Sequence, residues 1–414
     1  MKYLTYISFL WLSVLTSFVN FNEIKTTDAE NFSVHESDSI STILISAVGD
    51  LMCHSVQFNY SKTDNGNFDF NGVFREIRRY LSGANLTIGN LETVIAGIDK
   101  KYSGYPFFNS PDEFLSAIAA AGFDLLTTAN NHALDRGVEG LKRTIEKIRD
   151  EGMNCTGTFL SEADRDSVRI FYRNDFSIAV LAYSYGTNGI LIPQNLKYII
   201  NLIDEELISR DIASARNSGA EIVIVHFHFG NEYQRYPDQH QIDVVNSTIN
   251  AGADIILADH PHVIQPVKFF KPVNKKLDRG IVAFSLGNFI SNQRWRYSDA
   301  GIILQLRFSK NINTGFITLS EVSYTPTWVY KGNTGIRNEY IILPLNENQN
   351  YSSYPFLTDS DISKMKQAFE DTQEIISYFT DDIYLYRLPE ILVRPLYKGM
   401  ETIPHQSFIE KINF

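Results

Sequence analysis

Polar side chains gather directly after six short apolar runs of this 414-residue sequence, and their types are those that bind metal ions. The six groups are Gly49-Asp50; Gly89-Asn90-Leu91-Glu92; Asn130-Asn131-His132 with Asp135; His226, His228 and Glu232; Asp259-His260-Pro261-His262; and Ser285-Leu286-Gly287-Asn288. Five of the nine histidines belong to these groups. Because carboxylate, amide and imidazole groups with no thiolate directly beside them suit borderline divalent metals, the sequence predicts Mn, Fe, Zn or Co.

The spacing of the histidines adds to this prediction. His226 and His228 stand at positions i and i+2 of a strand and therefore share one of its faces. His260 and His262 flank a proline that restricts the backbone and could present both rings to one centre. About seven donors are too many for one tetrahedral ion but fit two metals about 3.5–4 Å apart that activate water. The alternative is structural, since Asp50, Asn90 and Asn131 could each cap a helix or form a turn.

The elements that must position these groups alternate between strand and helix. Short β-branched runs predict strands at 43–48, 86–89, 124–129, 178–183, 221–229, 254–258, 280–285 and 301–308. Amphipathic stretches predict helices at 73–81, 112–121, 138–150, 204–217 and 240–250. Such alternation indicates an α/β domain, residues 42–308, with a mostly parallel and buried sheet. Ligands of such sheets bind beyond the carboxyl ends of the strands, where the six polar groups lie.

The two ends of the chain follow other patterns. Residues 1–27 contain Lys2 and an apolar run, Tyr3 to Val19, which together predict a cleaved signal peptide or, alternatively, an uncleaved N-terminal anchor. Residues 28–41 read as a linker. We therefore expect the protein outside the cytoplasm: periplasmic, in the cell envelope or membrane-anchored. Residues 309–414 predict a C-terminal α+β extension, with antiparallel strands at 316–330 and 340–345 and a helix at 359–379.

Charge limits the partners of the protein. With 37 Lys and Arg against 48 Asp and Glu, the net charge is −11, the wrong sign for a nucleic-acid-binding surface. An anionic substrate must therefore be held locally, by metal ions or by the basic pair Arg294 and Arg296 that follows Asn288. The two cysteines, Cys53 and Cys155, are too few for a disulfide framework, and the sequence leaves open a single bridge between them without implying it.

Six motifs in order resemble the CapA/PgsA family of capsule and poly-γ-glutamate biosynthesis proteins, over about Ile43 to Asn292. They are Gly49-Asp50-Leu51-Met52; Asn90-Leu91-Glu92; Asn130-Asn131-His132 with Asp135; His228-Phe229-Gly230-Asn231-Glu232-Tyr233; His260-Pro261-His262-Val263-Ile264-Gln265; and Phe284-Ser285-Leu286-Gly287-Asn288-Phe289. The family looks like a divergent branch of the calcineurin-like metallophosphoesterases. The resemblance therefore implies a four-layer αββα sandwich of the metallophosphoesterase type.

The resemblance also implies roles for single residues. Asp50 stands where an aspartate binds a metal, Glu92 where an acid bridges two metals, and Asn131 where an amide ligand lies. The later imidazole ligands correspond to His228, His260 and His262. His132 takes the place of the histidine that acts on the leaving group, with Asp135 orienting it.

This sequence departs from the metallophosphoesterase pattern at two ligands. Asp50 is followed by Leu51-Met52 and lacks the usual Asp-x-His imidazole, for which His54 is a candidate substitute. Glu92 replaces an aspartate and extends the carboxylate by about one methylene group. His226, outside the matched motifs, and Glu232 are candidates for a further ligand or for a residue that supports one.

Three functions follow from these residues and from the resemblance. The leading hypothesis is an exported metal-dependent hydrolase that uses activated water on a phosphoester or a related anionic substrate, with Asn288, Arg294 and Arg296 as candidate substrate contacts. The second is a protein that binds or helps to export an anionic surface polymer without cleaving it. The third is γ-glutamyl amide hydrolysis or transfer at the same site. All three fit partnership with a membrane-bound polymer synthesis machinery.

Overall fold

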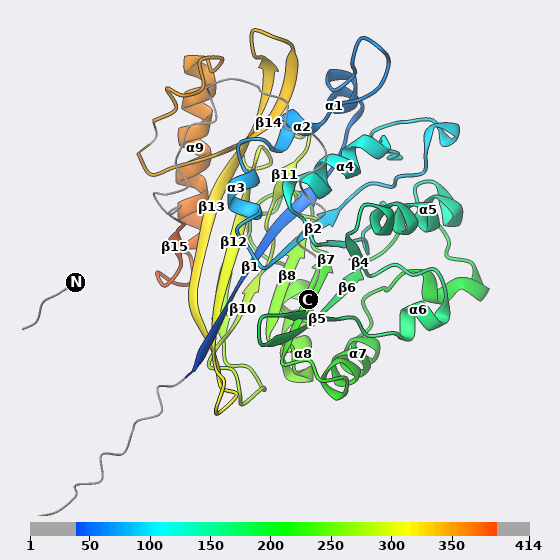
Figure 1. The fold of residues 1–414 in the computed structure, drawn as a ribbon, viewed down its shortest axis with the longest axis vertical. Coiled ribbons are helices and arrows are strands. Elements are labelled where there is room, and N and C mark those ends of the chain that lie inside the picture. The colour runs from blue at the N-terminus through cyan, green and yellow to red at the C-terminus, as the bar shows by residue number, and fades with distance from the viewer. Residues whose placement is uncertain (1–38, 349, 387–414) are drawn as a thin grey trace, which may run out of the picture. The chain divides into compact units, whose positions relative to one another are not determined.

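Two β-sheets form the centre of the protein in the computed structural model, which describes residues 39–348 and 350–386 (Figure 1). The first sheet is mixed. Its strand order is β14 (Asn338–Pro344), β13 (Ile317–Asn333), β12 (Ala300–Asn311), β1 (Ile40–Leu51), β2 (Leu86–Leu91), β3 (Leu125–Thr127) and β4 (Asn154–Thr156). Short strands β11 (Asn288–Ile290) and β15 (Tyr384–Leu385) pair with β1 and β13. Strands β1 to β4 run parallel, whereas β12, β13 and β14 are antiparallel additions.

The second sheet is parallel in its centre and antiparallel at both edges. Its order is β5 (Ile170–Arg173), β6 (Phe176–Ser184), β7 (Ile222–His228), β8 (Ile255–Asp259), β10 (Gly280–Ala283) and β9 (Val267–Phe270). Strands β6, β7, β8 and β10 are parallel, and β5 and β9 close the edges in the antiparallel sense.

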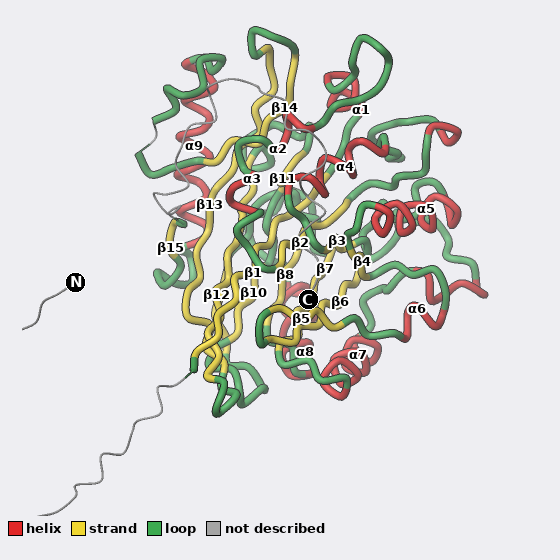
Figure 2. The backbone as a smooth tube through the Cα atoms, in the orientation of Figure 1, coloured by secondary structure: helices red, strands yellow, loops and turns green. Residues whose placement is uncertain are grey.

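Helices and loops flank the two sheets, as the tube view shows (Figure 2). The first sheet packs against α1 (Ser55–Tyr60), α2 (Asn71–Phe74), α3 (Arg78–Leu81), α4 (Asp112–Ala121) and α5 (Gly137–Asp150). The second packs against α7 (Glu205–Asn217) and α8 (Gln239–Ala251). The short helix α6 (Glu162–Asp166) lies in the connection before β5, and α9 (Asp359–Ile376) packs along β13.

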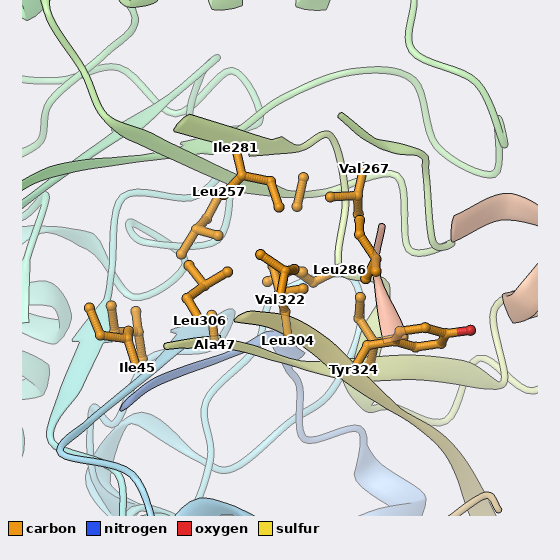
Figure 3. Packing of buried hydrophobic residues seen from close by; sticks show 14 of the residues in the cluster. Ile45, Ala47, Leu257, Val267, Ile281, Leu286, Leu304, Leu306, Val322 and Tyr324 are labelled. Carbon is orange, nitrogen blue, oxygen red and sulfur yellow. The ribbon is translucent and has the colours of Figure 1, made fainter. Parts of the chain in front are cut away.

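Side chains of β1 point alternately to the two faces of the first sheet, and this alternation shows how the layers are held together. Ile43, Ile45 and Ala47 face the second sheet, where they join an apolar core that includes Leu257 and Ile281 (Figure 3). On the opposite face, Val48 belongs to the core under the helices. Both faces of β1 are buried, as expected for a strand covered on two sides. The four-layer αββα arrangement is confirmed.

Several expectations needed correction. The helix predicted at 73–81 is two short helices, α2 and α3, because the Ile77 amide donates to the carbonyl of Phe74 three residues earlier and interrupts the α-helical pattern. The alternating pattern suggested one mostly parallel sheet, yet the strands divide between two sheets. Five short strands (β4, β5, β9, β11 and β15) were missed because two to four residues carry too little periodicity.

The strands predicted beyond residue 308 are present as β13 and β14, and they continue the first sheet beyond β12. The predicted helix is α9, and it adds Met365 and Phe369 to the core between the sheets. The predicted export segment, most of the predicted linker and the chain from residue 387 lie outside the described residues. Within the described part of the chain, no helix combines the length and hydrophobicity needed to span a membrane.

Candidate metal centre

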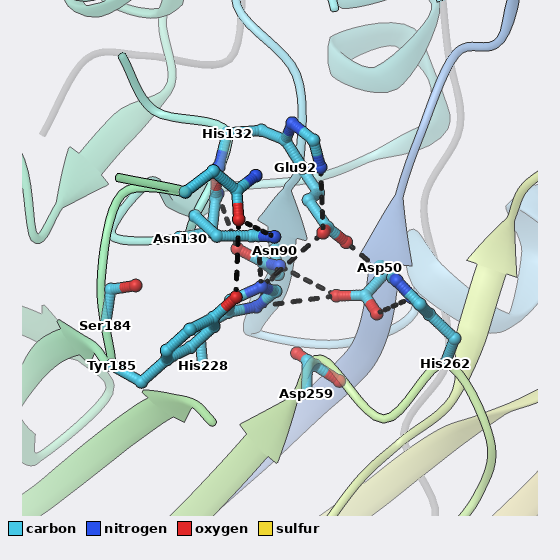
Figure 4. Close-up of polar contacts among 12 residues, drawn as sticks. Asp50, Asn90, Glu92, Asn130, His132, Ser184, Tyr185, His228, Asp259 and His262 are labelled. Atoms are coloured by element: carbon cyan, nitrogen blue, oxygen red, sulfur yellow. Dashed lines mark hydrogen bonds and ion pairs between the residues drawn. The ribbon is translucent and has the colours of Figure 1, made fainter. Parts of the chain in front are cut away.

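Strand ends from both sheets bring the candidate ligands together at one edge (Figure 4). Asp50 and Asn90 are register partners on the parallel strands β1 and β2. His228 and Asp259 are register partners at the last positions of β7 and β8 in the second sheet. Since all four strand ends point the same way, residues separated by two hundred positions meet in one buried cluster.

Asp50 is fully buried and is oriented by two neighbours. The Asn90 side-chain amide donates to its Oδ1 at 2.8 Å, and Nδ1 of His262 lies 3.1 Å from its Oδ2. Burial raises the pKa of Asp50, but the hydrogen bond and charge of His262 outweigh burial and hold the pKa below its ordinary value. The carboxylate is thus kept ionised, as a metal ligand requires.

Glu92 is the most informative residue of the cluster. It is fully buried, and among the described residues neither of its carboxylate oxygens has a hydrogen-bond partner. Its Oε1 lies 3.5 Å from Nε2 of His228, and its Oε2 lies 3.9 Å from Nδ1 of His262. Burial, and then the charge of Asp50, raise its pKa well above the ordinary value. A buried carboxylate without hydrogen bonds is costly unless a cation binds it, so the donor set fits a metal.

His228 is held as a neutral imidazole. The Asn90 amide donates to its Nδ1 at 3.2 Å, which leaves its Nε2 to donate to Oδ1 of Asn131 at 2.8 Å. Burial lowers its pKa to about 3. A neutral imidazole is the form that binds metals.

His260 and His262 both adopt positive φ values, 101° and 56°. Such backbone is strained for residues other than glycine and persists where the surroundings enforce it, often at functional sites. The backbone amide of Tyr233 donates to the carbonyl of Pro261 between them, at 2.7 Å, and so supports this conformation. The turn directs the two rings, 5.8 Å apart between centroids, toward the cluster.

In the described part of the chain, three sets of donors have ligand atoms within 4.8 Å of one another: Glu92, His228 and His260; Asp50, Glu92 and His262; and Glu232, His260 and His262. Glu92 belongs to two of these sets. The arrangement therefore offers adjacent positions for cations that share one carboxylate.

His132 lies beside these sets without belonging to them. Its Nδ1 is 2.7 Å from Oδ2 of Asp135, and its Nε2 is 4.0 Å from Oε1 of Glu92. The backbone amide of Phe108 donates to the same Asp135 oxygen at 2.6 Å. Burial lowers the pKa of His132, but the hydrogen bond to Asp135 and the charge of Glu92 raise it more. Asp135 thus orients the ring so that its Nε2 faces the cluster.

His226, at the edge of the sequence-based set, forms a second buried pair. Its Nε2 lies 2.7 Å from Oδ2 of Asp259, and both residues are almost completely buried. Sequence reasoning placed Asp259 at a strand end but assigned it no role. The feature that could have found this pair is the pairing register of β7 with β8, which brings the carboxyl ends of the two strands side by side.

The other candidates lie at the margin of the cluster. Nδ1 of His54 is 3.1 Å from Oε1 of Gln57 and accepts from the Asn292 amide, and His54 belongs to none of the three donor sets. Asn288 donates to Ser298 and Gln293. The guanidinium of Arg296 pairs with both oxygens of Asp371 on α9. Arg294 stacks on Trp328, and within the described residues it forms no hydrogen bond or ion pair.

Tyr185 was missed from the sequence, although it directly follows the predicted strand that became β6. Its ring lies 4.6 Å from that of His260, and its hydroxyl donates to Asn188, which also bonds Asn131. Inspecting the residues after this strand, as was done for the other six, would have found it.

Comparison with known proteins identifies the family of the chain. Residues 44–293 match the family described as bacterial capsule synthesis protein PGA_cap. The capsule biosynthesis protein CapA of Bacillus anthracis is 28% identical over 249 residues, which are 58% of this chain and 58% of that protein. The PGA biosynthesis protein CapA of Bacillus subtilis (strain 168) is 26% identical over 289 residues, 68% of this chain and 72% of that protein. The match thus spans less than two thirds of the B. anthracis relative.

Solved structures were also compared. An NAD nucleotidase of Haemophilus influenzae gives a TM-score of 0.43 at 13% identity, covering 84% of this chain and 64% of that one. A phosphatase from Mycoplasma pneumoniae gives a TM-score of 0.41 at 12% identity, covering 78% of this chain and all of that one, 100%.

Proposed function

Since the chain belongs to the PGA_cap family of bacterial capsule synthesis proteins, we propose that it is an exported, divalent-metal-dependent hydrolase acting in the synthesis of an anionic surface polymer. Its substrate is a phosphoester or a related anionic group. The protein works with the membrane-bound machinery that makes the polymer, in the periplasm or cell envelope.

One observation carries this proposal: the fully buried carboxylate of Glu92 lies among imidazoles and accepts no hydrogen bond from any described residue. A carboxylate placed there for stability alone would have hydrogen-bond donors. Asp50, Glu92 and His262 would hold one ion, and Glu92, His228 and His260 a second, with the Asn131 amide as a further donor. When bound, such ions supply Lewis-acid stabilisation of developing negative charge and activate water at neutral pH.

His132 supplies the proton that the leaving group needs. Its Nδ1 is occupied by Asp135, so that Nε2 is the atom available for proton transfer. The raised pKa favours a proton on the ring before the bond breaks. Because the pair lies beside the donor sets, the ring can act on the substrate without leaving its hydrogen bond.

Arg294 is the basic group that we assign to substrate binding. Within residues 39–348 and 350–386 its guanidinium forms no ion pair, although the charges of Asp299 and Asp361 act on it, whereas the guanidinium of Arg296 pairs with Asp371. In a chain of net charge −11, such a cation attracts an anionic group locally.

The test is the metal content of the purified protein together with hydrolysis of an alkyl phosphoester such as glycerol 2-phosphate, whose leaving group needs a proton. We expect Asp50→Ala to lose metal and activity, and His132→Ala to keep metal and lose activity. Asp69→Asn, which changes a surface carboxylate paired with Arg337, should change neither. Unchanged metal content and turnover in both site variants would refute the proposal.

A second candidate, metal-dependent binding of the polymer without cleavage, has one observation in its favour. The usual imidazole after Asp50 is absent, and His54 is turned to Gln57 and Asn292 instead. Metal-dependent retention of an acidic polymer, with no hydrolysis of phosphoesters or γ-glutamyl bonds, would select this function. Cleavage of γ-glutamyl bonds alone would select amide chemistry at the same site.

A further inference from the structure

Three large aromatic side chains remain exposed around the candidate metal centre. Tyr185 is 44% exposed, Tyr233 is 41% exposed and Trp295 is 51% exposed. We call these three residues the aromatic collar. They come from three different connections, after β6, after β7 and before β12, and therefore approach the centre from separate parts of the fold.

Two residues of the aromatic collar lie beside proposed metal ligands, and the third packs on one of these two. The ring of Tyr185 lies 4.6 Å from that of His260, and the ring of Tyr233 lies 6.0 Å from that of His262. Trp295 packs edge-on against Tyr233, with centroids 5.2 Å apart. Figure 4 shows Tyr185 beside His228 at the cluster. The exposed rings of Tyr185 and Tyr233 therefore lie next to proposed ligands, and Trp295 extends the same aromatic surface.

The exposure of the collar argues for a ligand. Single exposed apolar side chains are ordinary on a protein surface, but several together around a polar centre are typical of binding sites. Aromatic rings bury a large area when a ligand covers them, and their faces carry partial negative charge that attracts polarised C–H groups. The collar thus offers ring faces to a ligand that also carries such groups.

Polar groups next to the collar narrow the class of ligand. The side-chain amide of Gln293 donates to the Tyr233 hydroxyl at 3.3 Å, and the Tyr185 hydroxyl donates to Asn188 at 3.4 Å. Amides and phenol hydroxyls of this kind bond alcohol groups in either direction. Tyr233 and Trp295 cross at 65° and so form no parallel slot for a flat nucleobase.

We propose that the aromatic collar binds the sugar ring of a glycosyl phosphate, with the C–H face of the sugar on the aromatic rings and its hydroxyls near the amides. This inference rests on the proposed function, since the phosphate would occupy the metal centre. It also narrows that function, because a γ-glutamyl chain has no ring to stack. The favoured substrate class is therefore a sugar phosphoester.

The test compares three ligands with the Mn²⁺-loaded full chain, in a His132→Ala background that suppresses turnover. Isothermal titration calorimetry would give dissociation constants for glucose 1-phosphate, methyl phosphate and adenosine monophosphate. We expect glucose 1-phosphate to bind most tightly. Trp295→Ala and Tyr233→Leu should each weaken its binding about threefold to tenfold and leave methyl phosphate unchanged. Tyr172→Ala, an exposed aromatic on the edge strand β5, is the matched control and should change nothing.

Other outcomes would overturn the inference. Equal affinities for glucose 1-phosphate and methyl phosphate, tighter binding of adenosine monophosphate, or unaltered affinity in both collar variants would each exclude a sugar site. If the protein binds neither Mn²⁺ nor methyl phosphate, the proposed function fails instead. In that case the aromatic collar is tested separately with the neutral sugar maltotetraose. Binding of maltotetraose that Trp295→Ala weakens supports a sugar site, and absence of binding refutes the sugar site together with the proposed function.

Discussion

His262 and Asp50 meet at 3.1 Å, although 212 residues separate them in the sequence. His262 follows β8 of the second sheet, and Asp50 is the penultimate residue of β1 in the first sheet. Their contact shows that the candidate metal centre joins the two sheets. A change in how the sheets pack would therefore change the site.

Replacing Glu92 with glutamine should separate metal binding from stability. The amide is neutral and does not repel Asp50, so we expect the metal-free protein to gain about 1 kcal/mol in its free energy of unfolding. The same change should abolish binding of divalent metal, because two donor sets share this carboxylate. Denaturant unfolding with and without EDTA, together with metal analysis, measures both effects.

Glu339→Gln is the matched control for this variant. Glu339 is also largely buried, but it pairs with Arg75 and Arg337. Its replacement should lower stability and leave metal content unchanged. A loss of stability in the metal-free Glu92→Gln protein would contradict the idea that this carboxylate is held in an unfavourable environment.

Removal of His132 should affect substrates according to their leaving group. We expect His132→Ala to lower kcat by about 10²- to 10⁴-fold for an alkyl phosphoester, whose alkoxide needs a proton. The loss should be much smaller for a p-nitrophenyl ester, whose leaving group is stable without protonation. Asp135→Asn should show the same dependence on the leaving group with smaller losses of kcat, because Asp135 acts by orienting the His132 ring. Equal losses for both substrates would argue against proton donation by His132.

The two arginines after Asn288 should behave differently. Arg294→Gln should raise KM for an anionic substrate about threefold to fivefold at low salt and leave kcat unchanged. Arg296→Gln should leave KM unchanged and loosen α9, because its guanidinium bonds Asp371 of that helix. Steady-state kinetics at two salt concentrations check the assignment. A larger change in KM for the Arg296 variant would reverse it.

Asp164 should make a pH-dependent contribution to stability far from the site. It accepts hydrogen bonds from Arg149, Arg169 and the Leu160 amide. Burial raises its pKa, but these partners outweigh burial and lower the pKa below its ordinary value of 3.8. A lowered pKa means that the folded state favours the ionised form. The stabilisation is therefore complete above the unfolded pKa and is lost as the pH falls through the folded value.

We accordingly expect Asp164→Asn to lower the free energy of unfolding by about 1 kcal/mol near pH 7 after allowance for solvent screening. The difference between wild type and variant should shrink as the pH falls below about 4. Unfolding measured from pH 7 to pH 3 tests this. A difference independent of pH would show that shape, not charge, matters at this position.

The sequence by itself determined which residues could act as ligands and which end of each strand they follow. That information is local: β-branched runs end at Asp50, His228 and Asp259, and parallel strands place their ends at one edge. Periodicity also predicted most longer elements, including α4 at its observed bounds. The four-layer fold followed from the ordered motifs and the family that they resemble.

The tertiary structure decided what each side chain contacts, because those contacts join positions far apart in the chain. It paired His226 with Asp259 across two strands and held the Arg296 guanidinium against α9. It left both oxygens of Glu92 without hydrogen bonds from residues 39–348 and 350–386, and it gathered Tyr185, Tyr233 and Trp295 from three connections around one centre. Hydrogen-bond satisfaction and exposure depend on all neighbours in space, whereas strand ends and residue types can be read from neighbours in sequence.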